Sequence, residues 1–582
     1  MPTNGDASLT LKETPIENQR PLSVVVVGAG YSGIYTAIRL IQRLKNVEVN
    51  VYEQNEGVGG VWWVNRYPGV ACDIPSYSYQ YSFAPNPYWS SLYAPGSEIR
   101  AYLDDVATRF GAKRYIKTCH EVQRCVWDGE TKTWDVKVKN LVTGLTFNKT
   151  ANLLVSARGG LNDISWPKID GLWDFKGKLM HSAAWDESVD LRNKRVGVIG
   201  NGSSAIQIVP KVRALEGVKL WSFARSPTWI AARFGDNAMM KLGLDVHDTQ
   251  FSREHQERMA RHPGQYYKMR KVIETDSNMA YPIVLRGTEM QLAGKEMFER
   301  DMKQRLKTRP DLFKVMIPSF APGCRRLTPG PGYLESLGED NVTVVNTAIG
   351  RITETGVQLA SGENIELEAL ICATGFSTDA PPTFEVVGKG GMTLGQRWRP
   401  YMESYISVAV DGFPNFLMVG GPNSGVGVGS LTIVLESAGD YVVKVVRKMQ
   451  KEDYASIEPK AQRVADFSAI VDEYFKRTVF SDECSSWYRG GRRSGRIVAL
   501  WPGSTPHCLE ALRAPRWEDY DYEPVPNEAG STSNALRWMG NGWSQTQVDG
   551  DPSWYLDEGA VDVPEEGRPE EAAMNRLHPY SH

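Results

Sequence analysis

The segment Leu22–Gln54 reads LSVVVVGAGYSGIYTAIRLIQRLKNVEVNVYEQ. A run of valines leads into the pattern G-x-G-x-x-G, formed by Gly28, Gly30 and Gly33. Apolar residues then recur on one stripe of a helix, and a second, alternating strand ends at Glu53. Such glycines permit a tight turn and bring a pyrophosphate close to a helix N-terminus, while an acid at the strand end accepts hydrogen bonds from a ribose. The segment therefore predicts a dinucleotide-binding strand–helix–strand unit.

A second unit of the same design begins at Lys194 and reads KRVGVIGNGSSAIQIVPKVRALEGVKLWSFARSPTW. Its glycine pattern is G-x-G-x-x-A, formed by Gly200, Gly202 and Ala205. The residue at the end of the second strand stands 25 positions after the first glycine in both units, and here it is Arg225. An acid suits a ribose with free hydroxyls, whereas an arginine suits a ribose 2′-phosphate. The first site is therefore interpreted as an FAD site and the second as an NADPH site. A solvated charge at a strand end is the alternative for Arg225.

The composition is that of a chain with several ordinary globular domains. At 582 residues it is too long for one hydrophobic core and predicts two to four domains. Basic and acidic residues number 66 and 69, and this near balance argues against a broad nucleic-acid-binding face. The apolar runs are shorter than about 18 residues, so we expect no transmembrane segment. The N-terminus lacks the apolar region of a signal peptide.

Seven cysteines are scattered along the chain without a C-x-x-C pair or metal-ligand spacing. This pattern predicts no metal site and favours a reducing, cytoplasmic location. It also argues against a flavin-dependent disulfide reductase, because such an enzyme needs a redox-active cysteine pair and the sequence offers none.

The order of these segments predicts an α/β fold with two Rossmann-like dinucleotide-binding domains, a helical insertion and an irregular C-terminal wrap. A buried strand in LEALICATGF, Leu367–Phe376, and a helix from about residue 430 to 449 complete the two domains. The predicted parts are a disordered tail (1–20), the FAD-binding domain (21–164 and 374–484), the NADPH-binding domain (165–229 and 320–373), the helical insertion (230–319), broken at HPGQ, and the C-terminal extension (485–582), whose final 20 residues are expected to be disordered.

The segment FKGKLMHSAAWD, Phe175–Asp186, lies between the two glycine motifs. It fits the pattern F-x-G-x-x-x-H-x-x-x-W-[PD] at every specified position and resembles the fingerprint of type I Baeyer–Villiger monooxygenases. The resemblance extends over about residues 22 to 540, and LTPGPGYLESL and ALWPGS are similar to the fungal secondary-metabolite branch. It implies a hinge in which His181, with Trp185, helps to couple nicotinamide binding to catalysis without being the chemical base. A packed linker with a satisfied histidine is the alternative.

Two further segments carry the resemblance. GGVWWVNRYPGVACDIPSYSYQYSF, which closely follows Glu53, is similar to a segment that covers the flavin. APGCRRLTPGPGYL is similar to the segment that holds the family's active-site arginine, here Arg326. Its neighbour Arg325 matches a basic residue that joins Arg225 and Ser226 on the 2′-phosphate. A solvated basic pair is the alternative for the two adjacent arginines.

The motifs and the resemblance together imply two sets of site residues. Those expected in catalysis are Arg326, Asp73, His181 and Trp185. Those expected to bind FAD are Gly28, Gly30, Gly33, Glu53, Val61, Trp62, Trp63, Val64, Asp73, Ile74 and Tyr79. Those expected to bind NADPH are Ala71, Cys72, Gly200, Asn201, Gly202, Ser203, Ser204, Ala205, Ile206, Arg225, Ser226, Arg325 and Trp487.

The chain departs from the family's pattern at two places. SARGGLN has Arg158 where the family usually has a small residue or threonine, which bears on the contact at the domain junction. RGGRRSGR, after Trp487, differs from the usual glycine-rich run and bears on the loop that closes over the cofactor. Neither departure removes a residue that the chemistry needs.

The resemblance implies an enzyme that uses FAD, NADPH and O2 to insert one oxygen atom beside the carbonyl of a small organic ketone, giving an ester or lactone. A flavin must supply the oxygen activation, because side chains perform it poorly. A fixed guanidinium suits the anionic oxygen species and the developing oxyanion, and Asp73 could orient that of Arg326. A flavin-dependent hydroxylase of nitrogen or sulfur would share these motifs and stays open. A non-catalytic FAD-binding protein also stays open, although the intact Arg225, Arg326 and Asp73 argue against it. The oligomeric state stays open as well.

Overall fold

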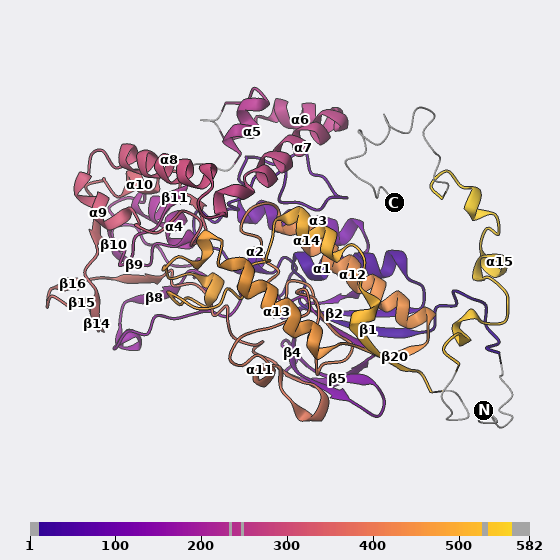
Figure 1. The fold of residues 1–582 in the computed structure, drawn as a ribbon. Helices are drawn as coiled ribbons and strands as arrows, with labels where there is room; N and C mark the ends of the chain where they lie inside the picture. The colour runs from indigo at the N-terminus through magenta and orange to yellow at the C-terminus, as the bar shows by residue number, and fades with distance from the viewer. Residues whose placement is uncertain (1–10, 232–234, 246–248, 527–533, 561–582) are drawn as a thin grey trace.

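Two parallel β-sheets, each of five strands, form the centre of the structure (Figure 1). The computed structural model describes residues 11–231, 235–245, 249–526 and 534–560. Both sheets have the same strand arrangement around a central strand that leads into a glycine turn. The α/β architecture with two Rossmann-like units is therefore confirmed.

The first sheet has the strand order β19-β7-β1-β2-β3, and all neighbouring strands run parallel. Its central strand comes from the run of valines before Gly28 and is buried along almost its whole length. Continuous burial of this kind is typical of a parallel strand covered on both faces. The strands are β1 (Leu22–Val27), β2 (Val47–Tyr52), β3 (Ile116–Lys117), β7 (Leu153–Ser156) and β19 (Phe416–Met418).

The second sheet has the order β8-β17-β9-β10-β13, again all parallel. Its central strand leads into the turn at Gly200, as β1 leads into the turn at Gly28. The chain therefore builds one topology twice and returns from the second sheet to the first. The strands are β8 (Lys178–His181), β9 (Arg195–Ile199), β10 (Lys219–Phe223), β13 (Val342–Val345) and β17 (Ala369–Cys372).

A smaller sheet packs against each parallel sheet. In both smaller sheets neighbouring strands run antiparallel, except that β18 runs parallel to β4. The one beside the first sheet has the order β18-β4-β5-β6, and the one beside the second has the order β14-β15-β16. These strands are β4 (His120–Asp128), β5 (Thr133–Asn140), β6 (Thr146–Ala151), β14 (Ile349–Thr353), β15 (Gly356–Leu359), β16 (Asn364–Glu366) and β18 (Glu385–Val387).

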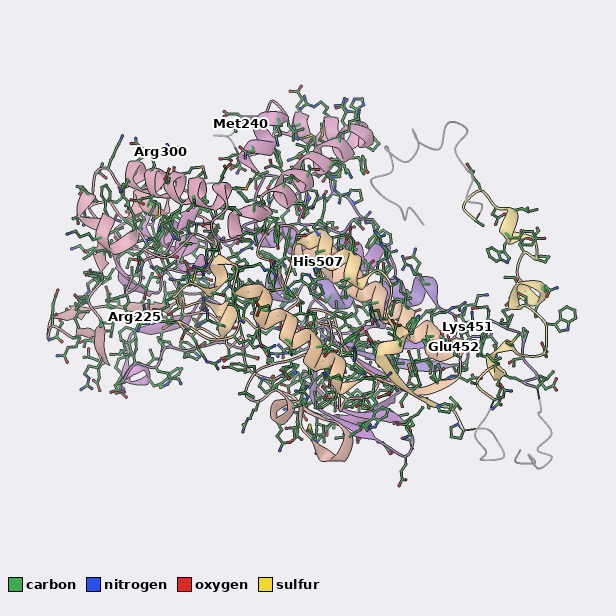
Figure 2. All side chains as sticks on the ribbon, viewed as in Figure 1. Arg225, Met240, Arg300, Lys451, Glu452 and His507 are labelled. Atoms are coloured by element: carbon green, nitrogen blue, oxygen red, sulfur yellow. A yellow bond between two sulfur atoms is a disulfide. The ribbon has the colours of Figure 1, made fainter. Side chains whose placement is uncertain are left out.

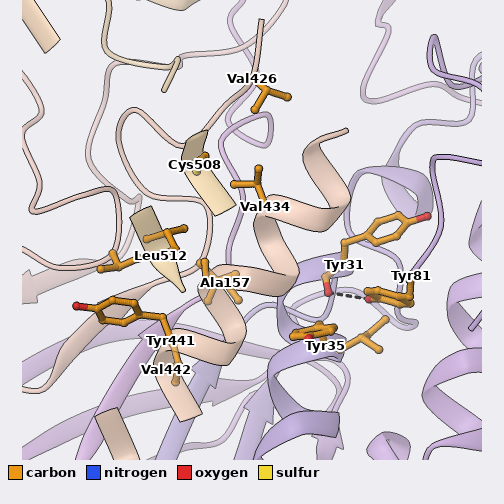
Figure 3. Packing of buried hydrophobic residues seen from close by; sticks show 14 of the residues in the cluster. Tyr31, Tyr35, Tyr81, Ala157, Val426, Val434, Tyr441, Val442, Cys508 and Leu512 are labelled. Atoms are coloured by element: carbon orange, nitrogen blue, oxygen red, sulfur yellow. Dashed lines mark hydrogen bonds between the residues drawn. The ribbon is translucent and has the colours of Figure 1, made fainter. Parts of the chain in front are cut away.

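Helices α1 (Tyr31–Arg43) and α12 (Leu431–Lys451) pack together over the first sheet, and α12 is the helix expected from about residue 430 to 449. Figure 3 shows aromatic side chains between them, with the Tyr81 hydroxyl donating to the Tyr31 carbonyl at 2.7 Å. Helix α4 (Ser203–Arg213) follows the second glycine turn. The first turn is thus held in a dense tyrosine-rich core.

The segment between the halves of the second unit is helical, and it covers one side of the molecule in Figure 1. The expected break at HPGQ is present, because α6 ends at Arg261 and α7 begins at Pro263. Its helices are α5 (Asp236–Lys241), α6 (Arg253–Arg261), α7 (Pro263–Met279), α8 (Glu289–Arg305) and α9 (Phe313–Met316). The later part of the chain adds α13 (Ala461–Phe475), α14 (Thr505–Leu512), α15 (Gln545–Asp549) and the antiparallel pair β20 (Tyr454–Pro459) and β21 (Tyr520–Pro524).

The segment before β1 contacts later parts of the chain from residue 11 onward. The Ile16 N–H donates to the Trp543 carbonyl at 2.8 Å, and Glu17 forms ion pairs with Arg447 and Lys451. The prediction of a disordered tail is therefore wrong for residues 11–20, because its partners stand hundreds of residues later and no local pattern identifies them. Residues 1–10 and 563–582, where disorder is also expected, lie outside the described residues.

The glycines at the two turns differ in what a side chain would meet. Gly28 and Gly200 have φ angles of +101° and +116°, and a Cβ there would lie 2.8 Å and 2.5 Å from the carbonyl oxygens of Ala157 and Ala373. Both positions need glycine for the fold itself. A Cβ at Gly202, in contrast, would meet nothing within 4 Å. Its small size leaves room at the N-terminus of α4, which is where a bound phosphate would approach.

Glu436 of α12 is a buried acid that joins this helix to the segment before α3 (Gly96–Arg109). Its carboxylate accepts hydrogen bonds from the Ser82 N–H at 2.7 Å and from the Ser82 hydroxyl at 2.5 Å. Burial raises the pKa of Glu436 from an ordinary 4.5 to about 7, although the bonds from Ser82 oppose this shift. The ionised form is therefore disfavoured in the folded chain.

Across the described ranges no helix combines the length and apolar character needed to span a bilayer. The same ranges contain no group of three or more histidine, cysteine, aspartate or glutamate side chains placed to hold a metal ion.

Glu436→Gln is expected to make the folded chain more stable at higher pH, where ionisation of the buried Glu436 carboxyl destabilises the wild type. Because the pKa of Glu436 is higher in the folded chain than in the unfolded chain, the stability from this group is full below about pH 4.5 and is lost as the pH rises through about 7. The variant should gain up to about 3 kcal/mol at pH 8 and little at pH 4.5, since one pKa unit corresponds to about 1.4 kcal/mol. Unfolding of variant and wild type at both pH values measures this gain. An equal change at both would contradict it.

Gly202→Ala is expected to separate folding from ligand binding at the second turn. The φ of Gly202 is −84° and the new Cβ has open space, so the stability should change by no more than about 0.5 kcal/mol. The methyl group would obstruct a phosphate, so NADP+ affinity should fall roughly tenfold or more. Thermal unfolding and NADP+ titration measure the two effects. The matched control Gly200→Ala should lose stability instead, and unchanged NADP+ affinity in Gly202→Ala would show that the ligand lies elsewhere.

Candidate active site

Arg326 and Asp73 form a two-point ion pair between segments 253 residues apart. The Nε–H of Arg326 donates to Oδ2 at 2.9 Å, and an Nη–H donates to Oδ1 at 2.8 Å. Asp73 lies in the segment after α2 (Val61–Val64), and Arg326 follows the helical insertion, just before β12 (Thr328–Pro329). The expected pairing of these two residues is therefore present.

Arg326 is a permanent cation within this pair, and both side chains are largely buried. The side chains of Arg326 and Asp73 are 23% and 21% exposed. Burial acts to lower the pKa of Arg326, but the Asp73 carboxylate opposes it, and the net result is a pKa above that of an ordinary arginine. A guanidinium has five N–H groups. Asp73 accepts from two of them and the Tyr488 hydroxyl interacts with the same guanidinium, so the others can donate to an anionic ligand or reacting oxygen.

Two buried side chains adjoin the pair. Tyr488 is 2% exposed and lies beside Arg326, and burial raises the pKa of its hydroxyl to about 12. Burial also raises the pKa of the Cys72 thiol, next to Asp73, so this thiol stays protonated. Sequence reasoning missed Tyr488, although it directly follows Trp487 in the chain.

The first glycine turn presents an uncapped helix N-terminus. No side chain caps α1 at Gly30, and its first turn contains no acidic residue. The free backbone N–H groups and the helix dipole therefore suit a phosphate. A Cβ at Gly30 would approach only Gly60, at 3.5 Å, whereas one at Gly33 would lie 1.8 Å from the Gly28 carbonyl oxygen. Gly30 thus leaves space for a ligand, and Gly33 permits close packing of the helix.

Glu53 lies directly after β2, beside this turn. One carboxylate oxygen accepts from the Ala29 N–H at 2.8 Å, and the other accepts from the backbone and side-chain amides of Asn55 at 2.9 Å and 2.6 Å. The carboxylate is therefore fixed in place by the chain. Each oxygen can accept further bonds, as a ribose hydroxyl requires.

The segment that includes α2 lies against the first turn. The Gly59 N–H donates to the Ala29 carbonyl at 2.9 Å, which places the start of α2 there. Further along, Trp62 Nε1 donates to the Tyr79 hydroxyl at 3.2 Å, and the two rings pack edge to face. Partial burial, as expected for contact with a ligand, is shared by Val61, Trp62, Trp63, Val64, Asp73, Ile74 and Tyr79.

The second glycine turn has a similar construction. Gly202 is the N-cap residue of α4, which has no side-chain cap and no acid in its first turn. The Asn201 side-chain amide donates to the Ser226 carbonyl, and the Ser203 and Thr328 hydroxyls are 2.6 Å apart. Behind this N-terminus the predicted residues Ala205 and Ile206 are buried in the core, and Ser204 is partly buried.

Arg225 and Arg325 approach this second turn from different segments. Arg225 is exposed just after β10, where Figure 2 labels it, and Arg325 donates to the Pro227 carbonyl at 3.2 Å. Burial lowers the pKa of Arg325. Within the described part of the chain no carboxylate forms an ion pair with either arginine. Two arginines without acidic partners beside one turn fit a phosphate group.

Gln207 of α4 connects this helix to the segment around Asp73. Its side-chain amide donates to the Ala71 carbonyl at 2.9 Å and accepts from the Tyr67 hydroxyl at 2.9 Å. Ala71 and Cys72, which were expected beside the nicotinamide, therefore lie close to the N-terminal half of α4. Sequence reasoning missed Gln207, because nothing in the glycine pattern distinguishes it from its neighbours.

The fingerprint segment supplies an edge strand of the second sheet. His181 ends β8 and is fully buried, with its ring 5.3 Å from Trp166 and 6.3 Å from Phe376. Among the described residues its Nε2 has no hydrogen-bond partner. Burial lowers the pKa of His181 to about 4, and the backbone of Gly375 opposes this shift. The imidazole is therefore neutral near pH 7.

Two linkers connect the parallel sheets. The first linker, residues 157–177 between β7 and β8, contains Trp166, and the second linker, residues 373–384 between β17 and β18, contains Phe376. The linkers pair with each other, since the Ser165 N–H donates to the Gly375 carbonyl at 3.0 Å and Ile164 forms a bridge with Phe376. His181 thus lies where the linkers meet, which agrees with a hinge. Trp185 packs on the core of the second sheet. Among the predicted catalytic residues, Arg326 and Asp73 bond to each other, whereas the ring of His181 packs beside Trp166 and Phe376.

Arg158, the first departure from the family pattern, is also tied to a linker. Its guanidinium pairs with Asp163, and its carbonyl accepts from the Asn162 side chain. A Cβ at Gly28 would lie 3.2 Å from the Arg158 Cα, so the arginine stands beside the first glycine turn. The departure therefore places an ion pair between that turn and the first linker.

The loop that carries Trp487 is fastened at two places. The Trp487 carbonyl accepts from the Thr378 hydroxyl at 2.8 Å. Cys484 forms a disulfide with Cys324, two residues before Arg326. The expectation of a chain without a cysteine pair is therefore wrong. The two cysteines stand 160 residues apart, and no spacing rule connects them.

The family model of the NAD(P)-binding Rossmann-like domain matches residues 26–95. The chain is 35% identical to the FAD-binding monooxygenase tazF of Aspergillus terreus over 549 residues, which cover 93% of this chain and 96% of that protein. It is 34% identical to a Baeyer–Villiger monooxygenase of Streptomyces coelicolor, over 87% of this chain and 94% of that one. The solved structure of oxidised steroid monooxygenase bound to NADP has a TM-score of 0.73 at 27% identity, over 87% of this chain and 100% of that one.

These similarities extend over nearly the full length of the relatives and agree with the two Rossmann-like sheets. The sequence argues against a disulfide reductase because it shows no cysteine pair, but the structure contains one. The similarities to monooxygenases are now the reason to exclude a disulfide reductase. The chain belongs to the family of FAD-binding monooxygenases that includes the Baeyer–Villiger monooxygenases.

Proposed function

We propose that this chain is an FAD- and NADPH-dependent monooxygenase that inserts one atom of O2 beside the carbonyl of a small organic ketone, giving an ester or lactone. The observation that carries the proposal is the Arg326–Asp73 pair, in which the partly exposed cation of Arg326 is fixed beside the segment around α2. The resemblance to the fungal secondary-metabolite branch supports a secondary-metabolite ketone as the substrate.

The residues present fit both cofactors. The uncapped N-terminus of α1, the fixed carboxylate of Glu53 and the partly buried side chains of α2 would hold FAD. The uncapped N-terminus of α4, with Arg225 and Arg325, would hold NADPH. Bound FAD and NADPH would supply hydride transfer and oxygen activation, which side chains perform poorly.

Arg326 would stabilise the negative charge that develops on oxygen during the insertion. Asp73 holds two of its N–H groups and so fixes the plane of the guanidinium before the reaction begins. A preorganised cation of this kind needs no reorganisation as charge develops. Because an arginine keeps its proton in a protein, Arg326 acts through its field and hydrogen bonds and transfers no proton.

Other side chains would keep water out and hold the halves of the site together. Trp62 and Tyr79 pack against each other in the segment around α2, and buried Tyr488 adjoins Arg326. Exclusion of water strengthens the field of a fixed charge. His181 stays neutral and buried at the linkers, so its contribution would be to the relative position of the two sheets.

Arg326→Ala is expected to keep bound FAD and to oxidise NADPH but to form hydrogen peroxide in place of oxygenated product. Loss of an oxyanion partner typically costs about 2.7–4 kcal/mol, so product formation should fall roughly a hundred- to thousandfold. Arg326→Lys should fail similarly, because lysine lacks the planar fork that Asp73 holds. NADPH loss, peroxide and product are followed together, with a ketone and a thioether as separate substrates.

The matched control for this variant is Arg397→Ala, which removes another partly buried arginine paired with an aspartate, Asp411. This variant should keep the wild-type ratio of product to peroxide. Normal product yield in Arg326→Ala would exclude the proposed role of this arginine. Oxygenation of the thioether alone would favour a heteroatom hydroxylase.

Arg225→Ala is expected to weaken the use of NADPH and to leave that of NADH nearly unchanged. A charge-assisted bond to phosphate is typically worth about 1.5–3 kcal/mol, so the KM for NADPH should rise roughly ten- to hundredfold. Steady-state kinetics with each coenzyme measure the change. The control is Arg192→Ala, an exposed arginine that pairs with Asp190. An equal loss with NADH would show that Arg225 supports the fold instead of the phosphate.

A further inference from the structure

We propose that the Cys324–Cys484 disulfide, together with Arg489, is a redox-sensitive clamp that holds Arg326 in its working position. The inference rests on the proposed function, because it concerns the same arginine and the same loop. The clamp is defined here as these three residues. Its removal would leave the two sheets intact and would loosen the loops that meet at the site.

The disulfide joins the two loops that meet at Arg326. Cys324 stands two residues before Arg326, and Cys484 stands four residues before Tyr488, which lies beside the same arginine. Both cysteines are buried, at 0% and 3% exposure. The two loops are therefore connected twice within a few residues, once by the disulfide and once by the contact between Tyr488 and Arg326.

Arg489 adds a charged group beside this disulfide. It is 2% exposed, and one Nη donates to the carbonyls of Phe480 and Asp482 at 2.7 Å and 2.9 Å. The same nitrogen lies 3.5 Å and 3.7 Å from the sulfur atoms of Cys324 and Cys484. A buried guanidinium therefore contacts both ends of the disulfide.

Asp482 extends the contacts to the helical insertion. Its carboxylate accepts from the Ala321 N–H at 2.8 Å and pairs with Arg286 at 2.8 Å. Ala321 lies on the loop of Cys324, and Arg286 lies just before α8. The loop of Cys484 is thus held from the side of the insertion as well as through sulfur.

The far end of the same loop is tied to the second linker by weaker bonds. The Thr378 hydroxyl donates to the Trp487 carbonyl at 2.8 Å, and the exposed Arg492 pairs with Asp379 at 2.6 Å. Exposed ion pairs of this kind contribute little stability. The covalent bond at Cys484 is therefore the strongest tie of the loop, and its loss would free the loop most.

Reduction of the clamp is a balanced two-electron exchange. A dithiol reductant gives two electrons and two protons, its own sulfur atoms join in a disulfide, and the bond between Cys324 and Cys484 breaks to give two thiols. The guanidinium of Arg489 next to both sulfur atoms would stabilise the thiolate that leaves in the first exchange step. Arg489 thus has two effects. Its hydrogen bonds to the Phe480 and Asp482 carbonyls hold the loop of Cys484, and its charge makes the disulfide easier to reduce.

Reduction should disturb the positions of the site residues without unfolding the chain. With the loop freed, Tyr488 and Arg326 would no longer be fixed relative to each other, and Trp487 would no longer hold its place beside the second linker. Small displacements at a reacting centre carry large losses in rate. We expect NADP+ to dissociate at least about threefold faster and peroxide to take a correspondingly larger share of the NADPH consumed.

The test compares oxidised wild type, wild type treated with dithiothreitol, and the double variant Cys324→Ser/Cys484→Ser, all loaded with FAD. Thiol titration of the denatured chain should give five free thiols before reduction and seven after it. Reduced wild type and the double variant should both release NADP+ faster and form more peroxide. The reductant should not affect the double variant, and reoxidation should restore the wild type.

The control variant is Cys119→Ser, a partly buried free cysteine outside the clamp, which should respond to the reductant as the wild type does. Seven free thiols before reduction would overturn the proposal. An unchanged rate of NADP+ release on reduction would also overturn it. A merely structural role of the cysteines would not produce NADP+ release and peroxide formation that change reversibly with the reductant in the wild type and do not respond to it in the double variant.

Failure of the proposed function gives a different result. If oxidised wild type oxygenates neither a ketone nor a thioether, the reaction assignment fails. The release of NADP+ and the peroxide formed without any substrate still report on the clamp. If product forms normally in both redox states, the reaction assignment stands and the clamp is excluded.

Discussion

The ion pair between Arg326 and Asp73 is the interaction on which the arrangement of the site depends. It joins the segment that lies against the first glycine turn to the segment that returns from the helical insertion. Breaking one partner of a well-buried pair typically costs about 3–5 kcal/mol, because a charge is left without compensation. This pair is only partly buried, so its own cost is smaller, yet the two segments still hold each other in place. A cation that is fixed in this way, with N–H groups left free, can serve a reaction that develops negative charge.

The two dinucleotide units could be predicted because their constraints are local. The positive φ angles at Gly28 and Gly200 and the close carbonyl groups of Ala157 and Ala373 require glycine within a few residues of a strand end. The alternating valines that precede Glu53 belong to a single strand, β2, although its last four residues are all buried. The break between α6 and α7 was likewise predictable, since a proline begins the second helix. Such signals depend on neighbours in sequence and not on the rest of the fold.

The remaining features depend on partners that are distant in sequence. Gln207 bonds to Ala71 and Tyr67, and Cys324 bonds to Cys484, but neither contact has a pattern that a single sequence displays. Residues 11–20 are polar enough to suggest a free tail, yet they pair with the end of the chain. Tertiary packing decides all three. The fingerprint segment Phe175–Asp186 could be predicted only in part. Its residues are recognisable from the sequence, but the burial of His181 beside the linkers is evident only in the structure.

Asp73 is expected to act on the reaction through Arg326. The most direct measurement is a double-mutant cycle on the rate of product formation, with Asp73→Asn, Arg326→Ala and the two combined. We expect the double variant to be no slower than Arg326→Ala alone, with a coupling free energy of at least about 1 kcal/mol. Losses that simply add would contradict it, because each residue would then act on the reaction independently.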